Sequence, residues 1–251
     1  NPEAPRVPII QHADVRRMLL WMKAHVEGMR ALMCYVSYCV DREHGTETEA
    51  DRDKYHGLLE VLTPICKAYC SDMAFKVTEL AIQTYGGYGF CSEYPVEQFM
   101  RDIKIASIYE GANGIQALDL VGRKMGLKKG MYFMSLLGEM NAAVAKYQGK
   151  EALKDLAGDV GRAANTLAET AMYFAESSKA GKFMIPVSNA YPFLMLMGKV
   201  VMAWLLLWEA GVAREKLDEI AAGKGIHPSD MQSLNLLAKE NADAAFYIGK
   251  V

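Results

Sequence analysis

Apolar side chains recur every three or four positions along most of the chain, the spacing that places them on one face of an α-helix. The first pattern stops in the charged, glycine-containing stretch 41–53, which we expect to be an exposed loop. The second stops at the glycine pair Gly86 and Gly87, a common end for a helix. Helices are therefore predicted at residues 14–36, 57–85, 95–103, 113–125, 131–147, 153–179, 192–222 and 228–247.

No stretch keeps the alternation of apolar and polar residues that marks a half-buried strand. We therefore expect an all-α chain of two antiparallel helical bundles in series, because bundle packing is the usual way to bury such apolar stripes. The glycine- and lysine-rich segment 126–130 is the expected boundary. The predicted domains are residues 1–126 and 127–251.

The longest apolar run, 193–208, contains Lys199 and is shorter than the ~20 residues that a membrane-spanning helix needs. It is expected to be a buried helix, and no membrane span is predicted. The chain begins without Met, and its first ten residues lack the charged and apolar segments of a signal peptide. We therefore expect it to be a fragment of a longer protein.

Composition and charge narrow the choice of partners and compartment. The 251 residues are 51% hydrophobic with 28 basic and 30 acidic side chains, and no basic cluster exceeds Lys128 and Lys129, so nucleic acid is not an expected partner. The five cysteines lie among apolar neighbours without a CxxC pair, which favours small core residues, a reducing compartment and a cytoplasmic protein. Cys66 and Cys70 are one helical turn apart, but no His follows at a ligand spacing, and no metal site is predicted.

One carboxylate stands out by its position. The stretch IYEGANGIQ, residues 108–116, places Glu110 between an aromatic residue and a run of small ones, where a helical pattern resumes. Most glutamates are solvated, so a loop carboxylate without a function is one interpretation. A chemical role is the other, and the choice depends on the rest of the chain.

Three motifs within residues 81–116 resemble the C-terminal helical domain of the flavin-dependent acyl-CoA dehydrogenases. They are AIQTYGGYGF, EYPVE followed by MRD, and IYEG followed by IQ, in the family's order and spacing. The resemblance covers about residues 10–124 and implies that domain's four-helix bundle. The second half resembles the additional C-terminal helical domain of a long bacterial subgroup that includes enzymes acting on methylthio-substituted acyl-CoA.

This resemblance implies the C-terminal part of an FAD-dependent enzyme that dehydrogenates an acyl-CoA thioester and passes electrons to an electron-transfer flavoprotein. Glu110 would remove the α-proton while the β-hydrogen leaves as hydride to the flavin. Such a base needs fixed placement, burial that raises its proton affinity, and donors for the developing enolate oxygen. In the family the N–H of the equivalent Glu is offered to the thioester carbonyl, and Tyr109 and Gly111 would line the acyl chain.

Two further segments match parts of the family that contact FAD. In many relatives a Thr and then a Gln follow the Glu-Gly pair and contact the flavin, so only backbone contacts carry over to Ala112, Asn113 and Gly114. The family's Arg-containing segment before the first helix is not recognisable in residues 1–10. The other segment reaches the flavin dinucleotide across a subunit interface, which implies a homodimer or larger assembly, and comprises Gln83, Thr84, Tyr85, Gly86 and Gly87.

Other residues are interpreted as structural. The methionines and tryptophans of residues 195–208 are expected in the core or at a subunit contact. Two functions stay open: part of a dehydrogenase, or a non-catalytic helical interaction module or degenerate homologue. The acyl-chain length, branching or sulfur content of a substrate is not specified by the sequence. Ion pairing or helix capping is expected of Glu93, Glu97, Arg101 and Asp102.

Overall fold

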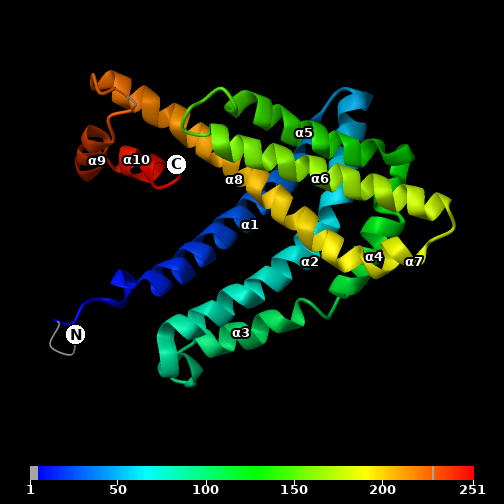
Figure 1. The fold of residues 1–251 in the computed structure, drawn as a ribbon, viewed down its shortest axis with the longest axis horizontal. Helices are drawn as coiled ribbons and strands as arrows, with labels where there is room; N and C mark the ends of the chain where they lie inside the picture. The colour runs from blue at the N-terminus through cyan, green and yellow to red at the C-terminus, as the bar shows by residue number, and fades with distance from the viewer. Residues whose placement is uncertain (1–4, 228) are drawn as a thin grey trace.

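The structure, a computed structural model, describes residues 5–227 and 229–251. Within these residues every regular element is a helix, which confirms the all-α prediction (Figure 1). The α-helices are α1 (Ala13–Gly45), α2 (Glu49–Tyr85), α3 (Val96–Ile105), α4 (Asn113–Gly122), α5 (Met131–Tyr147), α6 (Lys154–Lys179), α7 (Met184–Ser188), α8 (Ala190–Gly223), α9 (Met231–Glu240) and α10 (Ala242–Ile248), with short 3-10 helices η1 (Ile9–Gln11), η2 (Gly86–Phe90) and η3 (Lys124–Gly130).

The stretch 41–53 is mostly helical, so the predicted loop is wrong. α1 continues to Gly45 and α2 begins at Glu49. Thr48 caps α2, because its hydroxyl oxygen accepts a 3.1 Å hydrogen bond from the N–H of Asp51. Charged residues form helices well when they face solvent, and the Thr-x-x-Asp spacing is itself a helix-start signature. The helix start at Thr48 was thus indicated by the sequence, although the stretch is highly charged.

The ends of the other long helices follow the sequence pattern closely. α2 passes through the buried Pro64 and ends at Tyr85, and the residue that follows, Gly86, has a φ of +64°, a positive value that glycine permits. The helix predicted at 131–147 coincides with α5. The last predicted helix divides at Asn241, whose side chain caps α10 by accepting from the N–H of Ala244 at 3.0 Å. Its predicted first residue, Pro228, lies outside the described residues, and α7 was not predicted.

One hydrophobic core runs through both halves of the chain. α8 passes through its centre and packs against α1, α2, α4, α5 and α6. Gly198 of α8 makes the close contact with α2 possible, since a Cβ there would lie 2.3 Å from Cδ2 of the buried Tyr69 ring. A small second cluster joins the end of α8 to α9 and α10. The predicted boundary at 126/127 falls inside η3, and the core continues across it.

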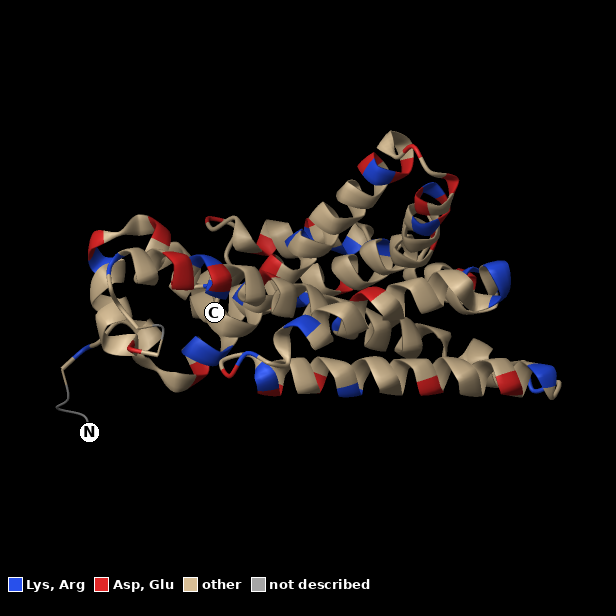
Figure 2. Ribbon diagram, turned by 90° about the horizontal axis from the view of Figure 1, so that it is seen from above, with Lys and Arg blue, Asp and Glu red and all other residues tan. Residues whose placement is uncertain are grey.

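α8 is the one described helix that is long and apolar enough to cross a membrane, judged by length and composition. In this fold 61% of its most apolar 18-residue window is buried among other helices, as in the core helix of a globular protein. Met197, Met202 and Trp204 lie in the core as expected, whereas Trp208 is exposed. Charged residues of both signs are interspersed along the outer helix faces in Figure 2.

The cysteines divide between core and surface. Cys39 is buried, and Cys66 and Cys70 are half-buried. Cys34 and Cys91 are exposed, so the prediction that all five are core residues is wrong for these two. Cys34 lies on the face of α1 that borders a cavity, and Cys91 follows η2, where the chain turns.

The C-terminal part of α2 and α3 form an arm that projects from the body of the molecule (Figure 1). η2 lies at its tip, where Phe90 is 85% exposed. Tyr85, Tyr88 and Phe99 are exposed along the same arm. The arm therefore leaves several large apolar side chains exposed to solvent.

Candidate functional site

Glu110 lies in the loop between α3 and α4. It has a φ of +52° and Gly111 a φ of +85°, so two successive left-handed residues turn the chain into α4. A residue other than glycine in this conformation costs about 1–2 kcal/mol and needs support from its surroundings. A Cβ at Gly111 would lie 2.7 Å from Nε2 of Gln116, so a larger residue there would also have to displace the end of that flexible side chain. The loop is a defined turn with one carboxylate on it.

Asn113 provides that support. Its buried side chain donates from Nδ2 to Ser71 Oγ (2.9 Å) and to the Ala68 carbonyl oxygen (3.1 Å), both on α2. Its Oδ1 accepts from Lys67 Nζ at 2.9 Å. The first residue of α4 is thereby joined to the middle of α2, and its side chain faces inward. The side chain is therefore not available for the predicted flavin contact, and the main-chain N–H of Asn113 donates to the Ser107 carbonyl oxygen at 3.2 Å.

The environment of Glu110 differs from the burial that a base requires. Its side chain is exposed and has no hydrogen-bond or ion-pair partner among the described residues, and Tyr109 beside it is half exposed. The main-chain N–H of Glu110 likewise has no acceptor within the described part of the chain. Both the carboxylate and the main-chain N–H of this exposed residue therefore have no partner among the described residues and can interact with a group outside this chain.

The segment of residues 83–87 lies at the end of α2. Thr84 Oγ1 donates to the Leu80 carbonyl oxygen at 2.8 Å, whereas the exposed amide of Gln83 has no partner among the described residues. No atom lies within 4 Å of a Cβ built on Gly86 or Gly87, so the backbone there is open to close approach. These features fit contact with a flat group through an amide and bare main chain.

The structure does not bring the two predicted parts of the site together within one chain. Gln83 lies twelve residues beyond Ser71, the residue that anchors the Glu110 loop, which is about 18 Å along α2. An open groove of about 790 Å³ runs between them along the arm, bordered by Phe90 near the tip and Ile108 next to the loop. The expectation that residues 83–87 reach a flavin held by another subunit stays a prediction.

Glu93, Glu97, Arg101 and Asp102 of the EYPVE and MRD motifs form no ion pairs within the described residues, so the ion-pairing part of that expectation is wrong. Glu97 lies in the first turn of α3, which has no side-chain capping hydrogen bond. Asp102 alone has a side-chain partner, accepting from Gln98 Nε2 at 2.6 Å. Among the described residues no group of three or more His, Cys, Asp and Glu side chains could hold a metal ion.

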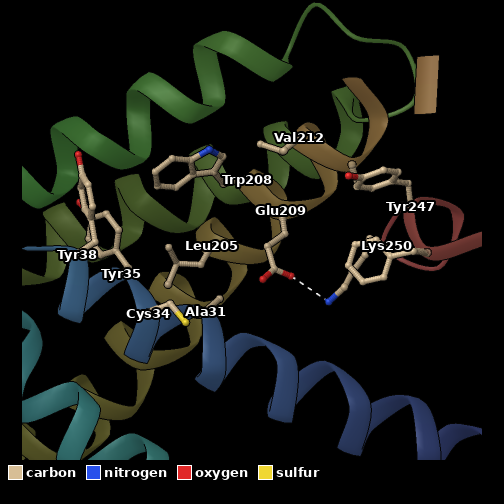
Figure 3. A pocket seen from close by; sticks show the side chains of 12 residues that line it. Ala31, Cys34, Tyr35, Tyr38, Leu205, Trp208, Glu209, Val212, Tyr247 and Lys250 are labelled. Carbon is tan, nitrogen blue, oxygen red and sulfur yellow. Dashed lines mark hydrogen bonds and ion pairs between the residues drawn. The ribbon is translucent and has the colours of Figure 1, made fainter. Parts of the chain in front are cut away.

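A second cavity, of about 710 Å³, lies between α1, α8 and α10 (Figure 3). It is lined by none of the predicted site residues. One signal of it is present in the sequence, namely the aromatic residues near the end of the apolar run of α8, which are expected in the core or at a subunit contact. Trp208 lines this cavity instead.

Comparison with known proteins assigns the chain to a protein family. The model described as "Acyl-CoA dehydrogenase, C-terminal domain" matches residues 1–126, and "Acetyl-CoA dehydrogenase C-terminal like" matches residues 136–251. A butyryl-CoA dehydrogenase of Syntrophomonas wolfei is 34% identical over all of this chain and 38% of its own length. The 3-methylmercaptopropionyl-CoA dehydrogenase of Ruegeria pomeroyi is 41% identical over 84% of this chain and 36% of its own length.

A solved structure shares the fold. The crystal structure of Caenorhabditis elegans ACDH-11 in complex with C11-CoA superposes with a TM-score of 0.66 over 76% of this chain and 31% of that chain, at 20% identity. The chain therefore spans between 31% and 38% of the length of these three proteins.

Proposed function

The chain belongs to the acyl-CoA dehydrogenase family, and we propose that it forms the C-terminal part of a flavin-dependent enzyme that dehydrogenates an acyl-CoA thioester between its α and β carbons. The observation that carries this proposal within the structure is the Glu110 turn. It combines an unpartnered carboxylate, an unpartnered main-chain N–H on the same residue, and a buried anchor directly after it.

Glu110 is the proposed base. Removal of a thioester α-proton leaves negative charge on the carbonyl oxygen, and a donor aimed at that oxygen lowers the barrier. The N–H of Glu110 can supply one such donor while its carboxylate takes the proton, because both belong to the same fixed turn. The burial that raises the proton affinity of the carboxylate is then supplied by the parts of the enzyme that cover the loop.

The exposed Gln83 amide and the bare backbone at Gly86 and Gly87 fit contact with FAD. The flavin, when bound, would accept the β-hydrogen as hydride. Because these residues lie far from Glu110 along α2, we propose that they serve the site of a second copy of the chain in a homo-oligomer. An electron-transfer flavoprotein is the proposed electron acceptor.

The substitution Glu110→Gln in the complete enzyme tests this function. It keeps the shape of the side chain but removes the base, so flavin reduction after rapid mixing with acyl-CoA should slow by at least ~10²–10⁴-fold while acyl-CoA binding survives. Glu93→Gln, a change at an exposed glutamate of the same arm, is the matched control and should leave the rate within about twofold. Reduction by Glu110→Gln at the control rate would overturn the assignment of Glu110 and place the base on a segment outside this chain.

A further inference from the structure

The cavity between α1, α8 and α10, here called the α1–α8–α10 pocket, has the size and walls of a ligand site. Its volume of about 710 Å³ lies within the range of pockets that bind small organic molecules. Figure 3 shows aromatic side chains from α1 and α8 on one side and Tyr247 of α10 on the other, with Glu209 between them. Residues of three separate helices thus line one pocket, which contains the carboxylate of Glu209 and the ammonium group of Lys250.

The aromatic walls are ordered and only partly covered. The rings of Tyr35 and Trp208 meet edge to face, with centroids 6.0 Å apart and planes at 72°. Trp208 is 38% exposed and Phe246 60% exposed, although both line the pocket. An apolar ligand that displaces water from these large exposed rings would bury apolar surface, which makes the free energy of binding more favourable.

The charges around the pocket determine which occupant fits. Lys250 Nζ lies 3.4 Å from a carboxylate oxygen of Glu209 and 3.2 Å from one of Glu27. Glu27 also pairs with Lys23 at 3.0 Å. Glu209 therefore has a single long ion pair among the described residues, to a lysine that another carboxylate shares.

We propose that the α1–α8–α10 pocket binds an organic cation with an apolar body, whose charged nitrogen lies beside Glu209 and against the aromatic rings. Such a ligand leaves no charge without a partner, because Lys250 keeps Glu27 when the cation takes Glu209. Aromatic rings attract cations through their electron-rich faces, and a cage of rings with a carboxylate suits an alkylated or aryl-substituted ammonium.

An anionic ligand fits less well. It would have to pair with Lys250, which would leave Glu209 without a counterion and place two negative charges side by side at a half-buried position. A neutral apolar ligand would gain from the walls but not from Glu209. The binding preference among these three classes therefore tests the proposal directly.

The experiment uses the complete protein that contains this chain, with benzyltrimethylammonium as the probe in isothermal titration calorimetry. Phenylacetate is the control ligand of opposite charge. Neopentylbenzene, in which carbon replaces the charged nitrogen, is the neutral control of the same shape, and its binding is measured by ligand-observed NMR. The cation is expected to bind about tenfold more tightly than either. A margin under threefold, or no binding of the cation at millimolar concentration, would overturn the proposal.

Two measurements locate the bound cation. Glu209→Gln should weaken binding about tenfold, whereas Glu215→Gln, the same change on the same helix at similar side-chain exposure (34% against 37%) but outside the pocket, should not change it. Cys34 lines the pocket and is exposed, so the probe should slow its alkylation while alkylation of Cys91 is unaffected. Either of two results would refute the site by itself. One is that the Glu209→Gln variant binds the probe as tightly as the original protein, and the other is that the probe leaves the rate of Cys34 alkylation unchanged.

Discussion

The side-chain amide of Asn113 donates a 2.9 Å hydrogen bond to the hydroxyl oxygen of Ser71, which ties the start of α4 to the middle of α2. The residues are 42 positions apart in sequence, and both are buried. The turn that carries Glu110 lies directly before Asn113. The left-handed backbone of this turn is thus supported by the contact between Asn113 and Ser71 of α2, outside the loop itself.

Asn113→Ala should destabilise the fold and disturb the turn. The change removes hydrogen bonds to Ser71, the Ala68 carbonyl and Lys67, and leaves buried polar groups without partners, at a cost of about 1–3 kcal/mol in the free energy of unfolding. Urea denaturation measures this cost. Asn165→Ala, at an exposed position in α6, is the control and should change the unfolding free energy by less than about 0.5 kcal/mol.

The same Asn113 variant separates anchoring of the turn from flavin contact. If Asn113 positions Glu110, the complete enzyme should keep its flavin content while flavin reduction by acyl-CoA slows. Loss of flavin with an unchanged reduction rate in the loaded fraction would assign Asn113 to cofactor binding instead.

Gly198→Ala should destabilise the protein although alanine favours helices. The added methyl group would lie 2.3 Å from a ring carbon of the fully buried Tyr69, and displacing that ring disrupts the contact between α2 and α8. Overpacking of this kind costs about 1–3 kcal/mol. Gly138→Ala, at an exposed site in α5 with no atom within 4 Å, should instead stabilise by up to ~1 kcal/mol. Thermal unfolding of the two variants should shift in opposite directions.

The cysteines should react with iodoacetamide in two classes. Burial raises the pKa of the Cys66 thiol to about 12 and the pKa values of Cys70 and Cys39 to about 11 each, so these three carry very little thiolate near pH 8. Cys34 and Cys91 are exposed and should be modified first. Peptide mass spectrometry on the native protein checks this order, and rapid labelling of Cys66 without denaturant would contradict the packing of α2.

Stability should fall as the pH drops below about 6.5, because of His25. Burial lowers the pKa of His25, as do the nearby charges of Lys199 and Lys76, although its hydrogen bond to the Trp21 carbonyl acts in the opposite direction. The unfolded chain therefore binds a proton at a higher pH than the folded chain, and this stability is present above the unfolded pKa and lost below it.

The variant His25→Gln isolates that contribution. Its urea midpoint should change less between pH 7.5 and 5.5 than that of the original protein. His44→Gln, at an exposed position, is the control and should leave the pH dependence as it was. An identical pH slope in the His25 variant would show that another group is responsible.

The sequence predicted most of the helices because their signals are local. The apolar spacing of residues 131–147 and the glycine stop at Gly86 depend only on neighbours along the chain, and both agree with the structure. The loop prediction for residues 41–53 was wrong because it rested on the charges of this stretch, whereas the capping residue Thr48 indicates the start of a helix. Asn241 was missed for a related reason, since one capping side chain divides a continuous apolar pattern.

The site was predictable only where a motif existed. Glu110 was selected by its place between Tyr109 and Gly111, and its left-handed turn agrees with the glycine that follows. The inward side chain of Asn113 was not foreseen, because its partners lie 42 to 46 residues away and no local pattern relates them. The pocket beside Trp208 needs three helices from opposite ends of the chain, and no single stretch of sequence encodes it.

α8 has a consequence for how the chain behaves as a polymer. Because this one helix supplies core side chains to α1, α2 and α4 as well as to α5 and α6, cutting the backbone within η3 would leave two fragments that each expose an unfilled apolar face. Cutting the chain at that point would leave the packing contacts between the two fragments in place. The fragments would stay associated until heat or denaturant melted both, and the two sequence regions would unfold as one cooperative unit.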